Sequence, residues 1–144
     1  MIRPATLADV EAIWRIANFE TRIYKELKPD TKKIRDGIIQ AISSARHFAW
    51  VSVDVHNDVQ GALVGLTSNN LWAQRKNCVV ALWSSYIVGD GAKLLREFKR
   101  WVQSRRVIRV AGLVPDSNNI DQRSYDLAGR IGFQRCGGAY LLYN

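Results

Sequence analysis

The order of helix-like and strand-like segments predicts an α/β (α+β) fold, in which one central sheet carries helices on both faces. The hydrophobic pattern switches repeatedly between the period of a helix and that of a strand, in the order β-α-α-β-β-β-α-β-α-β-β. No internal repeat, low-complexity tract or Pro/Gly/Ser-rich linker interrupts the 144 residues. We therefore expect residues 1–144 to form a single domain.

The first part of the chain predicts one short strand and two helices. Residues 2–4 are expected to form the strand, and Thr6 is expected to cap a helix over residues 7–19, where apolar side chains recur at helical spacing. A second helix should begin after Asp30 or Thr31. Its buried face would carry four isoleucines: Ile34, Ile38, Ile39 and Ile42.

Strand patterns begin at Phe48 and alternate with two more helices. Residues 48–55 and 59–66 flank the turn signal Asn57-Asp58, so they are expected to pair as a hairpin. The apolar, β-branched run over residues 77–88 predicts a central strand. The remaining expected elements are a helix over 92–104, a strand over 107–114, a helix over 121–131 closed by Gly132, and strands over 133–136 and 139–143.

Composition limits the classes of protein that the chain could belong to. Lys and Arg number 21 against 13 Asp and Glu, and this net charge of +8 favours polyanionic partners without choosing among them. No run of about 18 apolar residues exists, and the start lacks the layout of a signal peptide, so we expect a cytoplasmic protein without a membrane segment. Cys78 and Cys136 lack the spacing of zinc ligands, so we expect reduced thiols and no metal.

A glycine-containing loop joins the central strand to the helix that follows it. The loop reads Val88-Gly89-Asp90-Gly91-Ala92, and Lys93 follows in the first helical turn. Glycine allows close approach of an anion, and the first amides of a helix are unpaired donors at its positive end. The loop therefore predicts a phosphate site, although Gly-x-Gly is also found in plain tight turns. It matches neither a Walker A loop nor a dinucleotide fingerprint.

Three segments together resemble the GNAT acetyltransferase superfamily over nearly the whole chain. Residues 2–10 resemble the usual first strand and helix, and residues 121–133 occupy the frame of a frequent motif near the end of the domain. The cofactor motif (Arg/Gln)-x-x-Gly-x-(Gly/Ala) aligns with residues 86–91. This resemblance implies a mixed, mostly antiparallel sheet of about seven strands flanked by about four helices, with acetyl-CoA as co-substrate.

The resemblance also assigns site residues. The strand before the loop, including Leu82, Trp83 and Ser84, would offer free backbone groups to the pantetheine, and the segment from Val88 to Lys93 would take the pyrophosphate. The chain departs from the family pattern at four positions. Tyr86 replaces Arg or Gln, Trp83 replaces a frequent Pro, Asp121 stands at the cofactor-binding position of the usual Asn, and Ala128 replaces the frequent catalytic Tyr.

Acetyl transfer to an amine also needs an acid for the leaving thiolate and a base for the amine. Tyr125, one helical turn before Ala128, is the candidate acid, and its alternative role is packing against the sheet or the cofactor. The pre-loop strand contains no carboxylate or histidine, so the base is open. A water chain could act instead of the side-chain candidates, which are Glu20, Glu26, Asp54 and His56.

The sequence therefore predicts an N-acetyltransferase that moves an acetyl group from acetyl-CoA to an amine-bearing acceptor. Two other functions stay open. One is a non-catalytic CoA-binding or interaction protein, which Ala128 and the missing base favour. The other is an acyltransferase acting on nucleic acid, which the net charge favours. A homodimer is compatible with all three.

Overall fold

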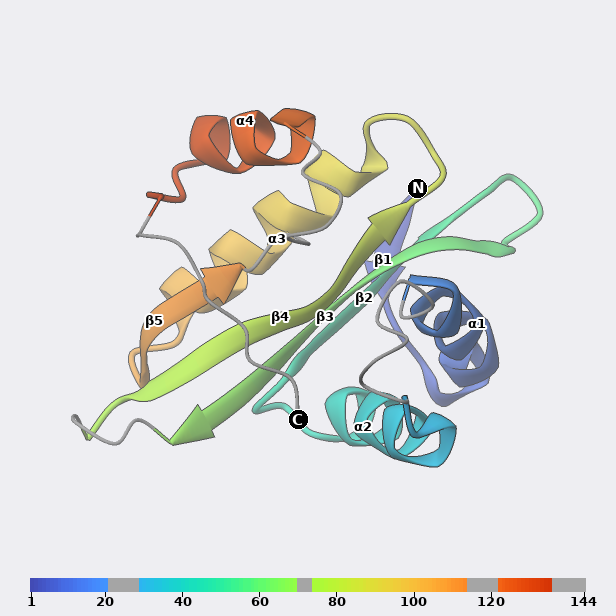
Figure 1. Cartoon of the computed structure of the whole chain (residues 1–144), viewed down its shortest axis with the longest axis horizontal. Helices are drawn as coiled ribbons and strands as arrows, with labels where there is room; N and C mark the ends of the chain where they lie inside the picture. The colour runs from blue at the N-terminus through green and yellow to red at the C-terminus, as the bar shows by residue number, and fades with distance from the viewer. Residues whose placement is uncertain (21–28, 70–73, 114–121, 136–144) are drawn as a thin grey trace.

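In the part of the chain that the structure describes, five strands form one sheet in the order β1-β2-β3-β4-β5 (Figure 1). The structure is a computed structural model, and it describes residues 1–20, 29–69, 74–113 and 122–135. All neighbouring strands pair antiparallel except β4 and β5, which run parallel. The strands are β1 (Ile2–Pro4), β2 (Phe48–Val53), β3 (Val59–Asn69), β4 (Lys76–Ser85) and β5 (Ile108–Leu113).

Helices cover both faces of this sheet. A short 3-10 turn (Leu7–Asp9) leads into α1 (Val10–Glu20), and α1 and α2 (Thr31–Ser43) pack on one face. On the other face α3 (Asp90–Ser104) packs against the strands, with α4 (Gln122–Ile131) beside it. The predicted fold class is confirmed: the described part of the chain is a mixed α+β domain with a mostly antiparallel five-stranded sheet and four α-helices.

Strand β2 contributes side chains to the hydrophobic cores on both faces of the sheet. Phe48 and Trp50 belong to the core under α3, whereas Val51 and Val53 are fully buried in the core under α1 and α2. Successive side chains of a strand point to opposite faces, so a strand between two helical layers must be apolar on both. The Phe48 ring meets the edge of Phe98 of α3, with ring centroids 5.3 Å apart.

Several element boundaries differ from the sequence predictions. The helix expected over 7–19 begins as a 3-10 turn, because the Asp9 amide donates to the Thr6 carbonyl three residues earlier. The strand expected over 77–88 ends at Ser85, and the next helix begins at Asp90 instead of Ala92. The strand expected over 133–136 is absent from residues 133–135, because the Phe133 amide caps α4 by donating to the Ala128 carbonyl. The strand expected over 139–143 lies outside the described residues.

Candidate functional site

A β-bulge in β4 decides which side chains face each helical layer. Val64 pairs with Leu82 but the next residue, Gly65, pairs with Val80, so Ala81 is an extra residue in β4. Before the bulge, Val80 packs in the core under α3; after it, Leu82 packs in the core under α1 and α2. The alternation of a strand then places Ser84 on the α1 side and Trp83 on the α3 side.

Within the described residues, the last half of β4 has an open edge. Pairing with β5 runs from Lys76 opposite Ile108 to Val80 opposite Leu113. Beyond that point, residues 81–85 pair only with β3 among the described strands. On the β3 side the two backbones lie close, because a Cβ at Gly61 would come within 2.7 Å of the Ser84 carbonyl oxygen. Along the other edge, the backbone groups of residues 81–85 have no partner among the described strands.

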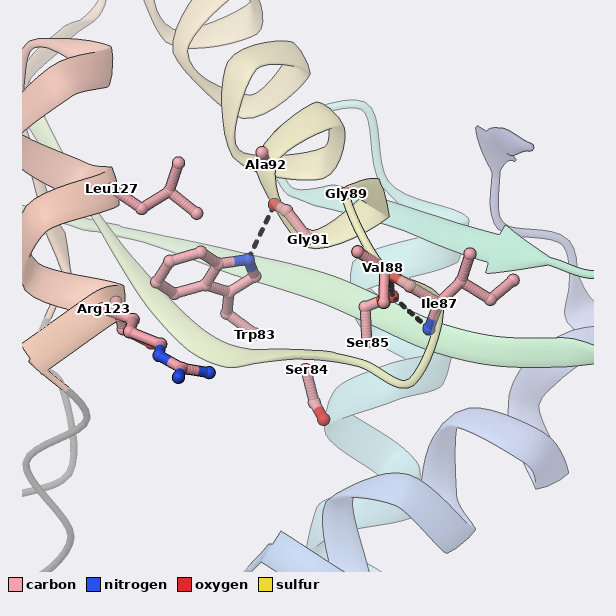
Figure 2. Close-up of a pocket in the computed structure, with 11 residues that line it drawn as sticks. Trp83, Ser84, Ser85, Ile87, Val88, Gly89, Gly91, Ala92, Arg123 and Leu127 are labelled. Atoms are coloured by element: carbon pink, nitrogen blue, oxygen red, sulfur yellow. Dashed lines mark hydrogen bonds between the residues drawn. The ribbon is translucent and has the colours of Figure 1, made fainter.

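The turn between β4 and α3 is held by a side-chain contact and a glycine cap. Ser85 Oγ accepts the Ile87 amide at 3.2 Å, and Gly89 caps α3 with a φ of 83°, a left-handed conformation that favours glycine. Among the described residues, no side chain forms a capping hydrogen bond at the start of α3. Trp83 Nε1 donates to the Gly91 carbonyl at 2.9 Å and so joins this turn to β4 (Figure 2).

These segments enclose a pocket of about 480 Å³. Three parts of the chain line it: the end of β4 with the following turn, the first turn of α3, and one face of α4. The lining residues are 83–85, 87–89, Gly91, Ala92, Arg123, Ser124 and Leu127. The pocket thus combines the open edge of β4, the positive end of α3 and the cationic side chain of Arg123.

A carboxylate on the α1 side of the sheet contacts one of the lining residues of this pocket. Glu20, the last residue of α1, accepts a hydrogen bond through Oε1 from Ser84 Oγ at 2.9 Å. Ser84 lines the pocket, and Glu20 is half-buried beside it. The bulge makes this contact possible, because it turns Ser84 toward α1.

Comparison with solved structures places this arrangement in a known fold. A possible acetyltransferase from Clostridium difficile 630 matches with a TM-score of 0.71 at 15% identity, over 100% of this chain and 96% of that one. An acetyltransferase of the GNAT family from Streptococcus pneumoniae matches with a TM-score of 0.64 at 18% identity, over 99% and 90% of the two chains. The chain has the GNAT fold.

A third structure with a similar fold is the aminoglycoside acetyltransferase meta-AAC0020, from an uncultured soil metagenomic sample, in complex with sisomicin. It matches with a TM-score of 0.65 at 12% identity, over 100% of this chain and 94% of that one. No protein-family model and no curated protein matches the sequence. The three-dimensional similarity therefore confirms the GNAT fold that the sequence motifs predict.

Within this GNAT fold the Asp90 side chain turns away from the pocket. It is 1% exposed and accepts bonds from Lys93 Nζ at 2.6 Å, Ser52 Oγ at 2.7 Å and the amino group of Met1 at 3.1 Å. The hydrogen bond from Lys93 is the main reason that the pKa of Asp90 falls to about 2. Lys93 and the Met1 amino group offset the carboxylate, so the first turn of α3 keeps its attraction for anions.

Two ionised aspartates give the folded chain a defined acid sensitivity. Asp9, bonded to Arg3 through both carboxylate oxygens, also has a pKa lowered to about 2 from the ordinary 3.8. A lowered pKa stabilises the folded state above about pH 4, and this stabilisation is lost as pH falls toward 2. We expect each carboxylate to contribute on the order of 2 kcal/mol to the free energy of unfolding at pH 7.

Urea denaturation between pH 5 and pH 2 measures this contribution. The Asp90→Asn variant should lose stability at pH 6 and show a shallower pH dependence than wild type below pH 4. An unchanged pH slope in that variant would show that Asp90 titrates normally in the folded chain.

The other predicted site residues divide into three groups. Six of them line the pocket: Trp83, Ser84, Val88, Gly89, Gly91 and Ala92. Leu82 is buried under α1 and α2, and Lys93 is bonded to Asp90, so neither is among the described lining residues. Asp121 and Glu26 lie outside the described residues.

Two candidate bases stabilise a hairpin turn. The Asp54 carboxylate accepts the amides of His56 and Asp58, at 2.8 Å and 3.0 Å. These residues follow β2 and precede β3, and none is among the described lining residues of the pocket. Of the side-chain bases proposed from sequence, Glu20 is the one that, within the described residues, contacts a lining residue of the pocket.

Tyr125 lies on another face of α4 from the pocket. Helix residues are spaced by about 100°, which places Tyr125 about 160° around α4 from Leu127. The Arg135 guanidinium lies over its ring, 5.5 Å from the ring centroid. Three lining residues of α4 were not predicted from the sequence: Arg123, Ser124 and Leu127. Their i, i+1, i+4 spacing inside the 121–133 motif places them near one another on the helix and was a usable signal.

Two negative findings apply to the described ranges. None of the helices there has the length and apolar character of a membrane span. Those ranges also contain no group of three or more His, Cys, Asp or Glu side chains placed to hold a metal ion. Cys78 is buried under α3, and this burial raises its thiol pKa.

Proposed function

We propose that this chain is an N-acetyltransferase that moves the acetyl group of acetyl-CoA to an amine of an acceptor. One observation carries the proposal: the uncapped first turn of α3 lies beside the open edge of β4 in a single pocket. The helix end suits a diphosphate, and the strand edge suits the amides of pantetheine. The structural likeness to acetyltransferases supports the same reaction.

The described residues fit a CoA thioester. Gly89 and Gly91 place backbone amides at the pocket without side chains to block them, and Arg123 adds a cationic side chain. Residues 83–85 line the same pocket along the unpaired edge of β4, where backbone N–H groups can hold the pantetheine and polarise the thioester carbonyl. The acetyl-CoA supplies the activated acyl group, and the protein positions it.

Glu20 is our candidate for the general base. An alkylammonium acceptor must lose a proton before it attacks the thioester, because the attacking lone pair must be free. The Glu20 carboxylate, held by Ser84 at the edge of the pocket, can take that proton directly or through one water. Its position on the α1 side leaves the α3 side of β4 to the cofactor.

Tyr125 as the acid for the leaving thiolate stays a prediction, and Tyr125→Phe tests it. A phenol that protonates the thiolate should lower kcat by about 100-fold when its hydroxyl is removed. Because the ring lies under Arg135 on another face of α4, we expect a much smaller fall, with acetyl-CoA affinity unchanged. Steady-state kinetics with saturating acetyl-CoA decides between the two roles.

Thermal unfolding with and without ligand tests cofactor binding. At about 100 times its dissociation constant, acetyl-CoA should stabilise the fold by about 2.7 kcal/mol, and CoA should act similarly. ATP at the same concentration is the control for general anion binding. Absence of any shift with acetyl-CoA would refute the proposal, whereas binding without transfer to any of a panel of polyamines, amino acids, peptides and tRNA would favour a non-catalytic CoA-binding protein.

A further inference from the structure

A second pocket lies at the other end of the sheet from the first. Its volume is about 180 Å³, and it forms where the start of β4, the start of β5 and the end of α3 meet the segment before β2. Figure 1 shows these segments at the end of the sheet opposite the turn between β4 and α3. Lys76 of β4 lines this pocket and Trp83 of the same strand lines the first one, so about 20 Å of strand separates the two pockets.

Positive charge surrounds this second pocket. Arg46, Lys76 and Arg105 are all among its lining residues, and none of the described residues that line it is acidic. In the described part of the chain no carboxylate forms an ion pair with any of these three cations. Arg46 and Lys76 also act electrostatically on His47. Burial is the largest cause of the lowered pKa of His47, and the positive charges of Arg46 and Lys76 lower it further. Such a cluster of unneutralised cations attracts anionic ligands.

The interior of the pocket is apolar and has one planar, cationic surface. The Arg105 guanidinium lies over the indole of Trp101, 5.3 Å from the ring centroid. Trp101 is itself held by Phe48 and Phe98, with ring centroids 5.6 Å and 6.2 Å away. A guanidinium supported in this way can stack a nucleobase on its free face.

The segment that carries Arg46 is fixed to the sheet. Thr67 of β3 donates its hydroxyl to the Arg46 carbonyl at 2.6 Å and its amide to His47 Nδ1 at 3.0 Å. These bonds hold Arg46 at the pocket although it follows the end of α2. The cationic arrangement is therefore part of the fold and does not depend on a free loop.

We propose that this second pocket binds single-stranded nucleic acid, with phosphates on Arg46, Lys76 and Arg105 and a base stacked on the Arg105 guanidinium. The net charge of +8 suits a polyanion, and the combination of cations with a planar stacking surface suits a nucleic acid better than an acidic peptide. This proposal does not depend on acetyl transfer, because it concerns a different pocket and requires no CoA.

Fluorescence anisotropy with labelled RNA of about 12 nucleotides, poly-rA or poly-rU, tests the proposal over a range of salt concentrations. The triple variant Arg46→Gln, Lys76→Gln, Arg105→Gln should bind at least about tenfold more weakly at low salt. Its slope of log K against log salt should be shallower by about 2, since each lost contact with single-stranded phosphate removes about 0.7. The matched control is Arg15→Gln, Lys32→Gln, Arg130→Gln, which removes the same charge from exposed positions elsewhere and should lose little affinity.

Three results would overturn the proposal. If the wild-type protein shows no salt-dependent RNA binding, the proposal is refuted directly. If the two triple variants lose RNA affinity equally, the binding reflects only the attraction of RNA to the net positive charge of the protein. Competition by poly-glutamate as effective as that by RNA would assign the pocket to acidic proteins.

The Arg105→Lys variant tests the stacked base, because lysine keeps the positive charge and removes the planar guanidinium. This variant should lose several-fold more affinity for poly-rA than for poly-rU. Equal affinity of wild type and Arg105→Lys for both RNAs would overturn the stacking contact.

Discussion

Glu20→Gln is expected to reduce kcat/KM at pH 7 by about 100-fold, the usual scale for a positioned general base. The substitution keeps the shape of the side chain and lets Ser84 Oγ still donate to the Gln carbonyl oxygen, so the contact at 2.9 Å can persist. Only the capacity to accept a proton is lost. Acetyl-CoA affinity should not change, because Glu20 lies on the α1 side of β4 and is not among the described residues that line the pocket.

The pH dependence separates a base from a merely structural residue. An amine with an ordinary pKa near 10 is almost wholly protonated at pH 7, so a variant without the base should regain activity as pH rises toward that value. The matched control is Glu11→Gln on the same helix, where Glu11 pairs with Arg35 at the surface. Equal rates for Glu20→Gln and wild type at pH 7 would remove Glu20 from the mechanism and favour a water chain.

The sequence predicted the α3 region well because two independent signals agree there. The apolar stripe through Leu94, Leu95 and Phe98 fixes the helix and its buried face, and those three side chains are fully buried. The Gly-x-Gly turn before it requires one residue with a left-handed backbone, and Gly89 has that conformation. Local periodicity and turn chemistry act over a few residues, so a single sequence reveals them.

The contacts that complete the candidate site could not be predicted in the same way. The bulge at Ala81 lies inside a continuous apolar run, where no turn residue marks it. Without the bulge, the positions of Ser84 and Trp83 on the two faces cannot be assigned. The Glu20–Ser84 bond joins residues 64 positions apart, and such a pair has no local signature.

Asp90 and Trp83 show how tertiary contacts change the role of a motif residue. Asp90 stands between the two glycines of the loop, which predicted contact with the cofactor. In the structure it is the buried partner of Ser52, Lys93 and the Met1 amino group. Trp83, which departs from the family pattern, anchors Gly91 through its indole N–H. Both side chains hold the pocket in shape while the backbone presents its amides.

Gly91→Asp is expected to weaken acetyl-CoA binding by about 100-fold, or about 2.7 kcal/mol. Gly91 lies in the first turn of α3 and lines the pocket, so the new carboxylate would stand where the diphosphate is proposed to bind. It would repel the phosphates and would compete for the same helix amides. The fold should survive, because an acidic residue in the first turn of a helix is favourable.

The Gly91→Ala variant shows whether the expected loss of acetyl-CoA affinity comes from the negative charge or from the volume of the new side chain. A Cβ at Gly91 would lie 3.6 Å from Trp83 Nε1 and 3.8 Å from Ser85 Cβ, which are ordinary contact distances. We therefore expect the alanine variant to bind acetyl-CoA within a few-fold of wild type. Isothermal titration calorimetry on both variants, with circular dichroism to verify the fold, makes the comparison. If a folded Gly91→Asp variant keeps wild-type affinity, then the first turn of α3 does not bind the diphosphate, and the Gly-x-Gly loop serves only to connect β4 to the helix.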